Sequence, residues 1–170
     1  LLSLLSVSVF SQTSNIFEPI DVFDLEYVSN TEISPIGNKV LYQRNFNNIM
    51  NDESFSNIWI INYDGTDNRP ITTGNFKDNS PKWSNKGDKF IFKSNREGKS
   101  QIFLFDLRNN SLQKLTNFQY SIESTQWSPN DKYILFSSFI DSDRDTLIEM
   151  PEKPKGAKWN DPPIEISDLN

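Results

Sequence analysis

One motif, a polar turn between two short apolar strands, occurs three times and constrains this chain more than any other feature. The copies lie at residues 33–42, 81–92 and 127–136. Their turn serines, Ser34, Ser84 and Ser128, are 50 and then 44 positions apart. A repeat of this length is typical of β-propeller blades, which are four-stranded sheets. The sequence therefore predicts an all-β fold.

The second copy shows the expected strand pattern most clearly. Its four strands are predicted at residues 80–84, 89–94, 101–107 and 112–116. The turns between them are rich in Asn, Asp, Gly and Ser, which tolerate positive φ or bond their own backbone. The third strand contains the run 102–105, apolar without alternation, which favours a strand covered on both faces by neighbouring blades. In the first copy, Pro70 lacks an amide donor, so we expect the fourth strand to be the outer edge of its blade.

The template divides the chain into a lead-in at residues 13–30 and an incomplete propeller at 31–170. We expect about three blades of four antiparallel strands, at about residues 31–73, 80–117 and 124–170. The Asn-rich stretch 45–56 is expected to be a long turn between the second and third strands of the first blade. Residues 23–28 fit either one helical turn or a short strand.

The third repeat departs from the template. Residues 146–150 are expected to form its third strand, but residues 151–163 contain four prolines, which exclude regular helix or central strand. Three blades cannot close a ring, which takes about four to eight. The chain is therefore interpreted as a fragment that holds a partial propeller.

Composition excludes several classes of function. The net charge is −6 and the 17 Lys and Arg residues are scattered, which argues against nucleic-acid binding. The chain has neither Cys nor His. Disulfides, thiolate catalysis, a Ser-His-Asp triad and Cys or His metal sites are therefore excluded within these residues. We expect no catalytic, cofactor-binding or metal-binding residue in the chain.

The first residues have features of a targeting segment. Residues 1–12 are largely apolar, and the small residues Ser8 and Ser11 stand three apart before Gln12. This pattern is typical of the end of a signal peptide, and the segment is too short to span a bilayer. It predicts a truncated signal peptide and an exported parent, periplasmic or secreted. The alternative is a buried N-terminal strand or helix.

An acidic loop late in the chain partly matches a calcium-binding loop. Asp141, Asp143 and Asp145, with Glu152, match loop positions 1, 3, 5 and 12. Thr146 stands where such a loop needs glycine for its sharp turn. A solvated acidic loop is the favoured interpretation, and calcium binding remains the alternative.

Other candidate positions have structural explanations that compete with functional ones. Trp83 and Trp127 end equivalent strands, where Ile33 stands in the first copy, and we expect them to pack between blades rather than to form ligand platforms. Arg96 could face a central channel and meet a substrate carboxylate, although a solvated hairpin charge is favoured. Acidic residues that could bind a peptide N-terminus, but that fit a solvated face by default, are Asp21, Asp24 and Glu26.

The repeated Trp-Ser turn with its Gly/Asp-Lys ending, and the blade ending at residues 64–72, resemble the TolB-like (PD40-type) propeller blade. The proline-rich segment 150–166 is similar to one in the N-terminal propeller of prolyl oligopeptidase family serine peptidases, particularly the acylaminoacyl-peptidase branch. The resemblance covers roughly residues 20–170. It implies a propeller followed by an α/β-hydrolase domain that carries Ser, Asp and His.

In that family the propeller covers the active site and admits peptides and other small substrates. No triad residue can be assigned here, because the matching region lies beyond Asn170, and the chain contains no Gly-x-Ser-x-Gly elbow. Residues 98–100 fit a hairpin turn instead. The first hypothesis is a substrate-gating propeller portion of an exported serine peptidase that acts on peptides. The alternatives are a non-enzymatic TolB-like propeller that binds a protein partner, and a purely structural repeat module. We expect neither nucleic-acid binding nor a membrane span.

Overall fold

The computed structural model describes residues 17–140 and 155–156. By its internal contacts the chain divides into two units, Leu1–Ile140 and Asp141–Asn170. The secondary structure described next lies in the first unit. The strand expected at residues 146–150, most of the proline-rich segment and the candidate calcium loop lie outside the described residues, so they stay predictions.

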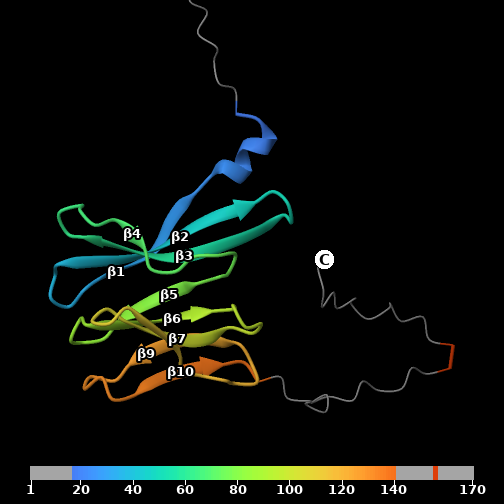
Figure 1. The fold of residues 1–170 in the computed structure, drawn as a ribbon. Helices are drawn as coiled ribbons and strands as arrows, with labels where there is room; N and C mark the ends of the chain where they lie inside the picture. The colour runs from blue at the N-terminus through green and yellow to red at the C-terminus, as the bar shows by residue number, and fades with distance from the viewer. Residues whose placement is uncertain (1–16, 141–154, 157–170) are drawn as a thin grey trace, which may run out of the picture. The chain divides into compact units, whose positions relative to one another are not determined.

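Three antiparallel sheets follow one another along the chain (Figure 1). The first contains β1 (Tyr27–Ile33), β2 (Lys39–Asn48), β3 (Glu53–Asn62) and β4 (Arg69–Pro70). The second contains β5 (Asn79–Trp83), β6 (Lys89–Ser94), β7 (Gln101–Asp106) and β8 (Ser111–Lys114). The third shows β9 (Ile122–Trp127) and β10 (Ile134–Ser138) within the described residues. In the first two sheets the strands pair in chain order, which confirms the predicted all-β, partial-propeller architecture.

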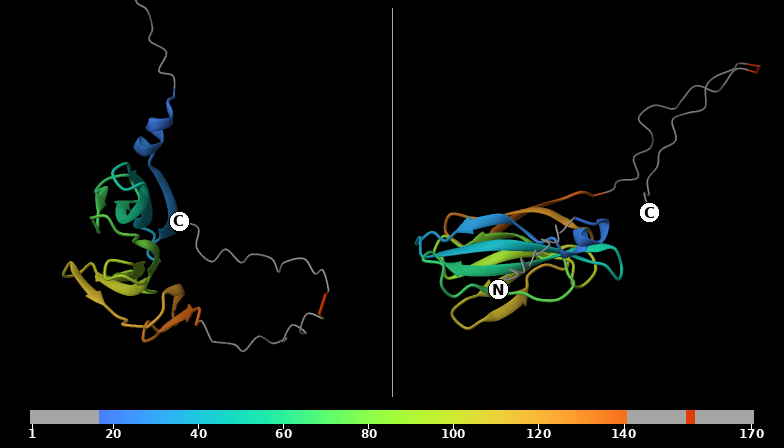
Figure 2. Two further views of the ribbon diagram at one scale, coloured as in Figure 1. Left: turned by 90° about the vertical axis from the view of Figure 1, so that its right-hand side faces the viewer. Right: turned by 90° about the horizontal axis from the view of Figure 1, so that it is seen from above.

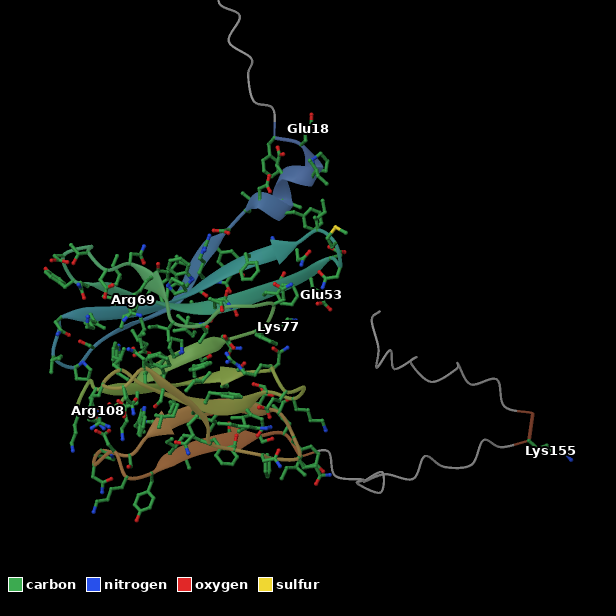
Figure 3. All side chains as sticks on the ribbon, viewed as in Figure 1. Glu18, Glu53, Arg69, Lys77, Arg108 and Lys155 are labelled. Atoms are coloured by element: carbon green, nitrogen blue, oxygen red, sulfur yellow. The ribbon has the colours of Figure 1, made fainter. Side chains whose placement is uncertain are left out.

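The first strands of the three sheets lie next to one another, β1 beside β5 and β5 beside β9, and side chains fill the spaces between sheets (Figures 2 and 3). One apolar cluster joins the first two sheets through Leu41, Ile58, Ile60, Trp83, Phe90, Phe92, Phe103 and Phe105. A second, smaller cluster joins the second and third sheets through Ile91, Ile102 and Ile122. Strand β7 contributes to both clusters, which confirms that it is covered on both faces. Pro70 lies in β4 at the edge of its sheet, also as predicted.

The three repeated turns share one backbone geometry. In the second, the N–H of Ser84 donates to the carbonyl of Lys89 (2.9 Å), and the N–H of Gly87 donates to the carbonyl of Ser84 (2.9 Å). The same bonds close the turns that begin at Ser34 and Ser128. Gly87 has φ 70°, a left-handed conformation that glycine adopts without strain. The repeated serine is therefore a turn residue, as its recurrence in each repeat predicted.

The prediction of a long loop at residues 45–56 is wrong. Strands β2 and β3 stay paired out to Asn48 and Glu53, and only a tight turn separates them. The cross-strand pair Phe46 and Phe55, with ring centroids 5.9 Å apart, supports this end of the hairpin. The asparagines obscured the strand because they are depleted in sheets in general.

Of the lead-in predicted at residues 13–30, the structure describes residues 17–30. Within them a 3₁₀ helix, η1 (Pro19–Asp24), is followed by β1, which begins at Tyr27. Asn30 has φ 47° at an irregularity in the β1–β2 pairing, and the strand continues on both sides of it. The alternatives for residues 23–28 are thus both partly correct, because the segment contains a helix end and a strand start. In the part of the chain that the structure describes, no helix is long and apolar enough to cross a membrane.

Candidate functional site

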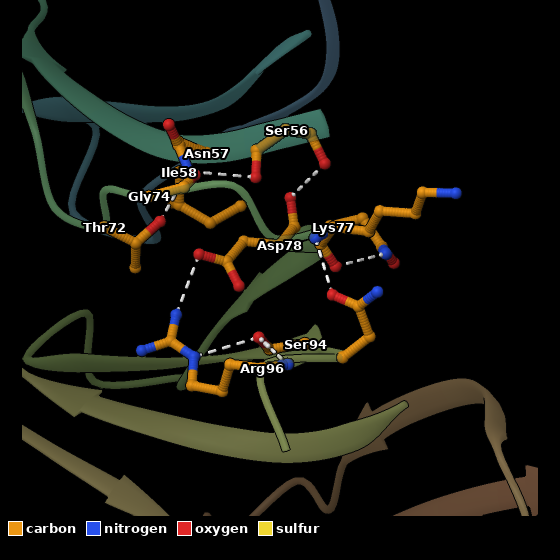
Figure 4. A network of polar contacts seen from close by, with 11 residues as sticks. Ser56, Asn57, Ile58, Thr72, Gly74, Lys77, Asp78, Ser94 and Arg96 are labelled. Atoms are coloured by element: carbon orange, nitrogen blue, oxygen red, sulfur yellow. Dashed lines mark hydrogen bonds and ion pairs between the residues drawn. The ribbon is translucent and has the colours of Figure 1, made fainter. Parts of the chain in front are cut away.

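A buried ion pair lies where the chain passes from the first sheet to the second (Figure 4). Nη2 of Arg96, from the β6–β7 hairpin, is 2.8 Å from Oδ2 of Asp78, which precedes β5. Nε of Arg96 donates to Oγ of Ser94 (2.9 Å). The Asp78 side chain is 0% exposed and that of Arg96 is 18% exposed. The guanidinium carbon lies 4.9–5.6 Å from three ring centroids, those of Phe76, Phe92 and Phe103.

Arg96 is therefore neither the solvated charge nor the channel-facing receptor that the sequence allowed. Its charge is neutralised by Asp78 inside the blade, and its ring contacts are cation–π interactions. Both interpretations of Arg96 are wrong for the same reason. The position of Arg96 in a hairpin does not reveal that its partner is the carboxylate of Asp78, 18 residues earlier in the chain.

The segment around Asp78 is held from both sides. Oγ of Ser56 donates to the backbone carbonyl of Asp78 (2.8 Å), and the N–H of Ser56 donates to the carbonyl of Phe76 (2.9 Å). From the second sheet, Asn95 Oδ1 accepts the N–H of Lys77 (2.8 Å). The other carboxylate oxygen of Asp78, Oδ1, is buried without a hydrogen-bond partner among the described residues. This junction fixes the backbone next to the hollow described below.

A polar hollow of about 420 Å³ lies between the first sheet and the start of the second. Its lining residues are Tyr27, Asn30, Gln43, Asn45, Asn47, Ser54, Phe55, Ser56, Lys77, Asn79 and Ser80. A chain of side-chain amides crosses it: Asn30 Nδ2 donates to Gln43 Oε1, and Gln43 Nε2 donates to Asn45 Oδ1, each at 2.6 Å. Gln43 and Asn45 are buried, so these bonds satisfy groups that would otherwise be costly to bury.

Two equivalent backbone irregularities shape this hollow. Asn30 in β1 and Ser80 in β5 both have left-handed φ, 47° and 53°, and both lie at register shifts against the next strand. Such bulges turn a side chain away from the regular alternation of a strand. The sequence does not reveal this site, because its residues come from several separate segments and Asn and Ser carry no periodic signal.

The two tryptophans pack between blades, as predicted. Trp83 is buried in the first cluster, against Phe90, and its Nε1 donates to the carbonyl of Glu32 in β1 (3.0 Å). Trp127 repeats this contact one blade later, where its Nε1 donates to the carbonyl of Lys82 (3.0 Å). The indole groups thus join successive first strands at equivalent positions.

The candidate acidic residues near the start of the chain serve local structure. Asp21 accepts the N–H of Glu18 (2.8 Å) at the beginning of η1, and Glu26 pairs with Arg44 of β2. These contacts account for two of the three carboxylates that were considered for a peptide N-terminus. Among the described residues, no group of three or more His, Cys, Asp or Glu side chains is placed to hold a metal ion.

Shifted pKa values occur at turns and between blades. The side-chain hydrogen bond from Arg108, followed by the Arg108 backbone N–H, lowers the pKa of Asp106 to about 2. Burial alone raises the pKa of Asp131, but hydrogen bonds from Asn85 and Lys86 outweigh this and lower it. Burial lowers the pKa of Lys93. Each shift has a structural cause, in a turn or in a contact between blades.

The sequence is similar to those of known β-propeller proteins. A family model described as TolB beta propeller domain (PD40) matches residues 27–153. The chain is 26% identical over 151 residues to the uncharacterized peptidase YuxL of Bacillus subtilis, covering 88% of this chain and 22% of that protein. It is 28% identical over 102 residues to the TolB homolog of Chlamydia abortus, covering 59% of this chain and 24% of the relative.

A solved structure supports the fold. Acylaminoacyl peptidase of Pyrococcus horikoshii matches with a TM-score of 0.62 and 23% identity, over 79% of this chain and 20% of that one. At this identity the likeness shows the fold alone. The chain spans 22% and 24% of the two curated relatives, so their activities do not transfer to it directly. The relatives include both classes that the sequence predicted, peptidases and TolB proteins.

Proposed function

The chain belongs to the TolB β-propeller (PD40) family, and from this premise we propose that it is the substrate-gating propeller portion of an exported serine peptidase acting on peptides. The observation that carries the proposal is the match to YuxL, a curated peptidase, over 88% of this chain. The catalytic serine, aspartate and histidine would lie in a hydrolase domain outside these residues, since the chain contains no histidine.

A propeller suits gating because its blades are rigid and its passage is narrow. The first strands of successive blades line the centre of such a ring, and β1, β5 and β9 are the first strands here. An active site covered by the ring would accept peptides that thread between loops and exclude folded proteins. The indole contacts join neighbouring blades, and the buried Asp78–Arg96 pair fixes the start of the second blade.

Export is part of the proposal and rests on residues 1–12. Their apolar run, with Ser8 and Ser11 before Gln12, fits the end of a secretory signal peptide. Fractionation of cells that express the parent protein tests this. Export is supported if the protein appears outside the cytoplasm, and a strictly cytoplasmic protein would contradict it.

The parent protein provides the decisive experiment. We expect a Gly-x-Ser-x-Gly motif downstream, followed by Asp and His. We also expect covalent labelling by a serine-directed fluorophosphonate, with faster hydrolysis of short N-acylated peptides than of folded proteins. Substitution of the motif serine by alanine is the matched control and should remove both labelling and hydrolysis. The peptidase proposal would be wrong if the parent sequence continued as propeller blades up to its stop codon and the protein were not labelled by the fluorophosphonate.

One observation favours a second candidate, a non-enzymatic propeller that binds a protein partner. The match to the TolB homolog has 28% identity, slightly above that to YuxL, although it covers less of the chain. In that case the parent would end with the propeller, and affinity purification would recover a stable partner. The same downstream sequence distinguishes the two candidates.

A further inference from the structure

The lining of the polar hollow between the first two sheets carries positive charge and no negative charge. Among its lining residues, Lys77 is the only charged one, and none is acidic, on a chain whose net charge is −6. Within the described residues, the Lys77 ammonium forms no ion pair, and the carboxylate of the neighbouring Asp78 pairs with Arg96. Figure 4 shows the Lys77 side chain extending away from the pair between Asp78 and Arg96.

Three side-chain amides that line the same hollow as Lys77 add unused donors. Asn30, Gln43 and Asn79 each use one of two side-chain N–H groups, in bonds to Gln43 Oε1, Asn45 Oδ1 and the carbonyl of Lys77. Each therefore keeps an N–H that no described residue accepts. The Lys77 ammonium adds three more donors. A ligand that complements this lining must bring acceptors and negative charge, which a carboxylate does with its two oxygens.

The position and size of the hollow favour an extended chain. Tyr27 and Asn30 come from β1, and Asn79 and Ser80 from β5, so the first strands of both blades line it. Its volume of about 420 Å³ falls in the ordinary range of ligand sites, roughly 300–1,000 Å³. Tyr27, which is 64% exposed, offers apolar ring surface beside the polar groups. A short peptide segment carries both kinds of surface.

We propose that this hollow binds a carboxylate of an extended peptide, with the Lys77 ammonium as its counter-charge and the side-chain amides of Asn30 and Asn79 as further donors. The choice of a peptide rests on the proposed function, whereas the choice of a carboxylate rests on the lining alone. The carboxylate is either the C-terminus of the peptide or an acidic side chain. The two sources share one chemistry and are separated by experiment.

The test is a titration of the isotope-labelled 170-residue chain with three N-acetylated tetrapeptides, followed by NMR. One is tetra-alanine with a free C-terminus, the second is its C-terminal amide, and the third is an amidated peptide with one glutamate. We expect the side-chain amide signals of Asn30 and Asn79 to shift with a carboxylate-bearing peptide and not with the neutral amide. Binding should weaken as salt is raised, because the Lys77 side chain is exposed.

Lys77→Gln removes the charge and should weaken binding about tenfold, as expected for losing a charge-assisted hydrogen bond. Lys77→Arg keeps the charge and should retain binding within about threefold. Lys132→Gln is the matched control, since Lys132 is also exposed but does not line the hollow, and it should leave binding unchanged.

If the peptide with a free C-terminus binds more tightly than the amidated glutamate peptide, the site recognises the end of a peptide. If the two bind equally, the site accepts a carboxylate from either source. Binding of the neutral amide with equal strength, no binding by any of the three, or an unchanged affinity in Lys77→Gln would overturn the proposal. The titration involves no hydrolysis. Its failure therefore leaves the peptidase proposal standing, and a parent without peptidase activity leaves a positive titration standing.

Discussion

At the residue scale, the buried Asp78–Arg96 pair is expected to contribute strongly to stability. Both charges are withdrawn from water, and each depends on the other for compensation. Arg96→Met should lower the free energy of unfolding by about 3 kcal/mol, since it leaves the Asp78 carboxylate buried and unpaired. Urea unfolding followed by tryptophan fluorescence measures this change.

The matched control uses a second arginine–aspartate pair on the surface. Arg69 and Asp67 are 42% and 44% exposed, so Arg69→Met should change stability by no more than about 1 kcal/mol. The double variant Asp78→Asn with Arg96→Met should recover part of the loss, because no buried charge remains. Equal effects of Arg96→Met and Arg69→Met would show that burial of the pair contributes nothing.

Asp106 should make stability depend on acid pH. The Arg108 hydrogen bonds lower its pKa from 3.8 to about 2 in the folded chain, so folding favours the ionised carboxylate. The contribution is fully present above the unfolded pKa and is lost as pH falls through the folded value, between about 4 and 2. Asp106→Asn should flatten the fall in unfolding free energy over this window, measured by urea titrations at pH 5, 3.5 and 2.5.

The acid effect of Asp106 should also be small and should shrink in salt, because the Arg108 side chain is 64% exposed. Asp67→Asn is a suitable control, since it removes a carboxylate from another exposed aspartate–arginine contact. If Asp106→Asn follows the wild-type curve throughout, its pairing with Arg108 does not contribute to the acid dependence.

At the element scale, the first strands of adjacent blades are joined by an indole-to-carbonyl hydrogen bond that recurs with the repeat. Trp83→Phe keeps one aromatic ring in the first cluster and removes the donor to the Glu32 carbonyl together with the second ring of the indole. We expect a loss of about 2 kcal/mol in unfolding free energy, of which about 1 kcal/mol is the usual net value of one hydrogen bond and the rest is lost packing. Trp83→Ala should cost about 3–5 kcal/mol, because it also removes the buried ring. A Phe variant as unstable as the Ala variant would contradict this prediction, because the aromatic ring that it keeps would then contribute nothing.

The bounds of some strands could be predicted from the sequence, and those of others could not. Strand β6 was predicted with its observed bounds, because apolar residues lie between two turns with strong Gly and Asn signals. The hairpin end at Phe46 and Phe55 was missed, since its asparagines have poor strand propensity and the cross-strand ring contact is visible only once the strands are paired. Local signals predict turns well, and pairing can override propensity between them.

At the scale of the whole molecule, the repeat determined the architecture, but it did not reveal the hollow. The period of the turn serines predicts successive blades because each blade must cover the apolar face of the next. The hollow depends on side chains such as Asn30 and Lys77, which come together only when two blades and the segment between them are in place. The buried Arg96 was hidden for the same reason, since its partner lies in a different element.

Because each blade contacts its neighbours in chain order, stability should also be transmitted from neighbour to neighbour. Leu41 belongs to the larger cluster between the first two blades, and Ile122 to the smaller cluster between the second and third. Ile122→Ala should cost about 2–4 kcal/mol locally and speed amide hydrogen exchange in β9 and β10, while exchange in β2 and β3 stays near wild type.

Leu41→Ala is the reciprocal variant and should speed exchange in β2 and β3 more than in β9 and β10. In the wild type, the amides of β6 and β7 should exchange most slowly, since this blade is covered on both faces. Hydrogen exchange measured by mass spectrometry resolves these segments. If either variant accelerates exchange equally in all three sheets, the blades unfold as one cooperative unit and the neighbour-to-neighbour description is wrong.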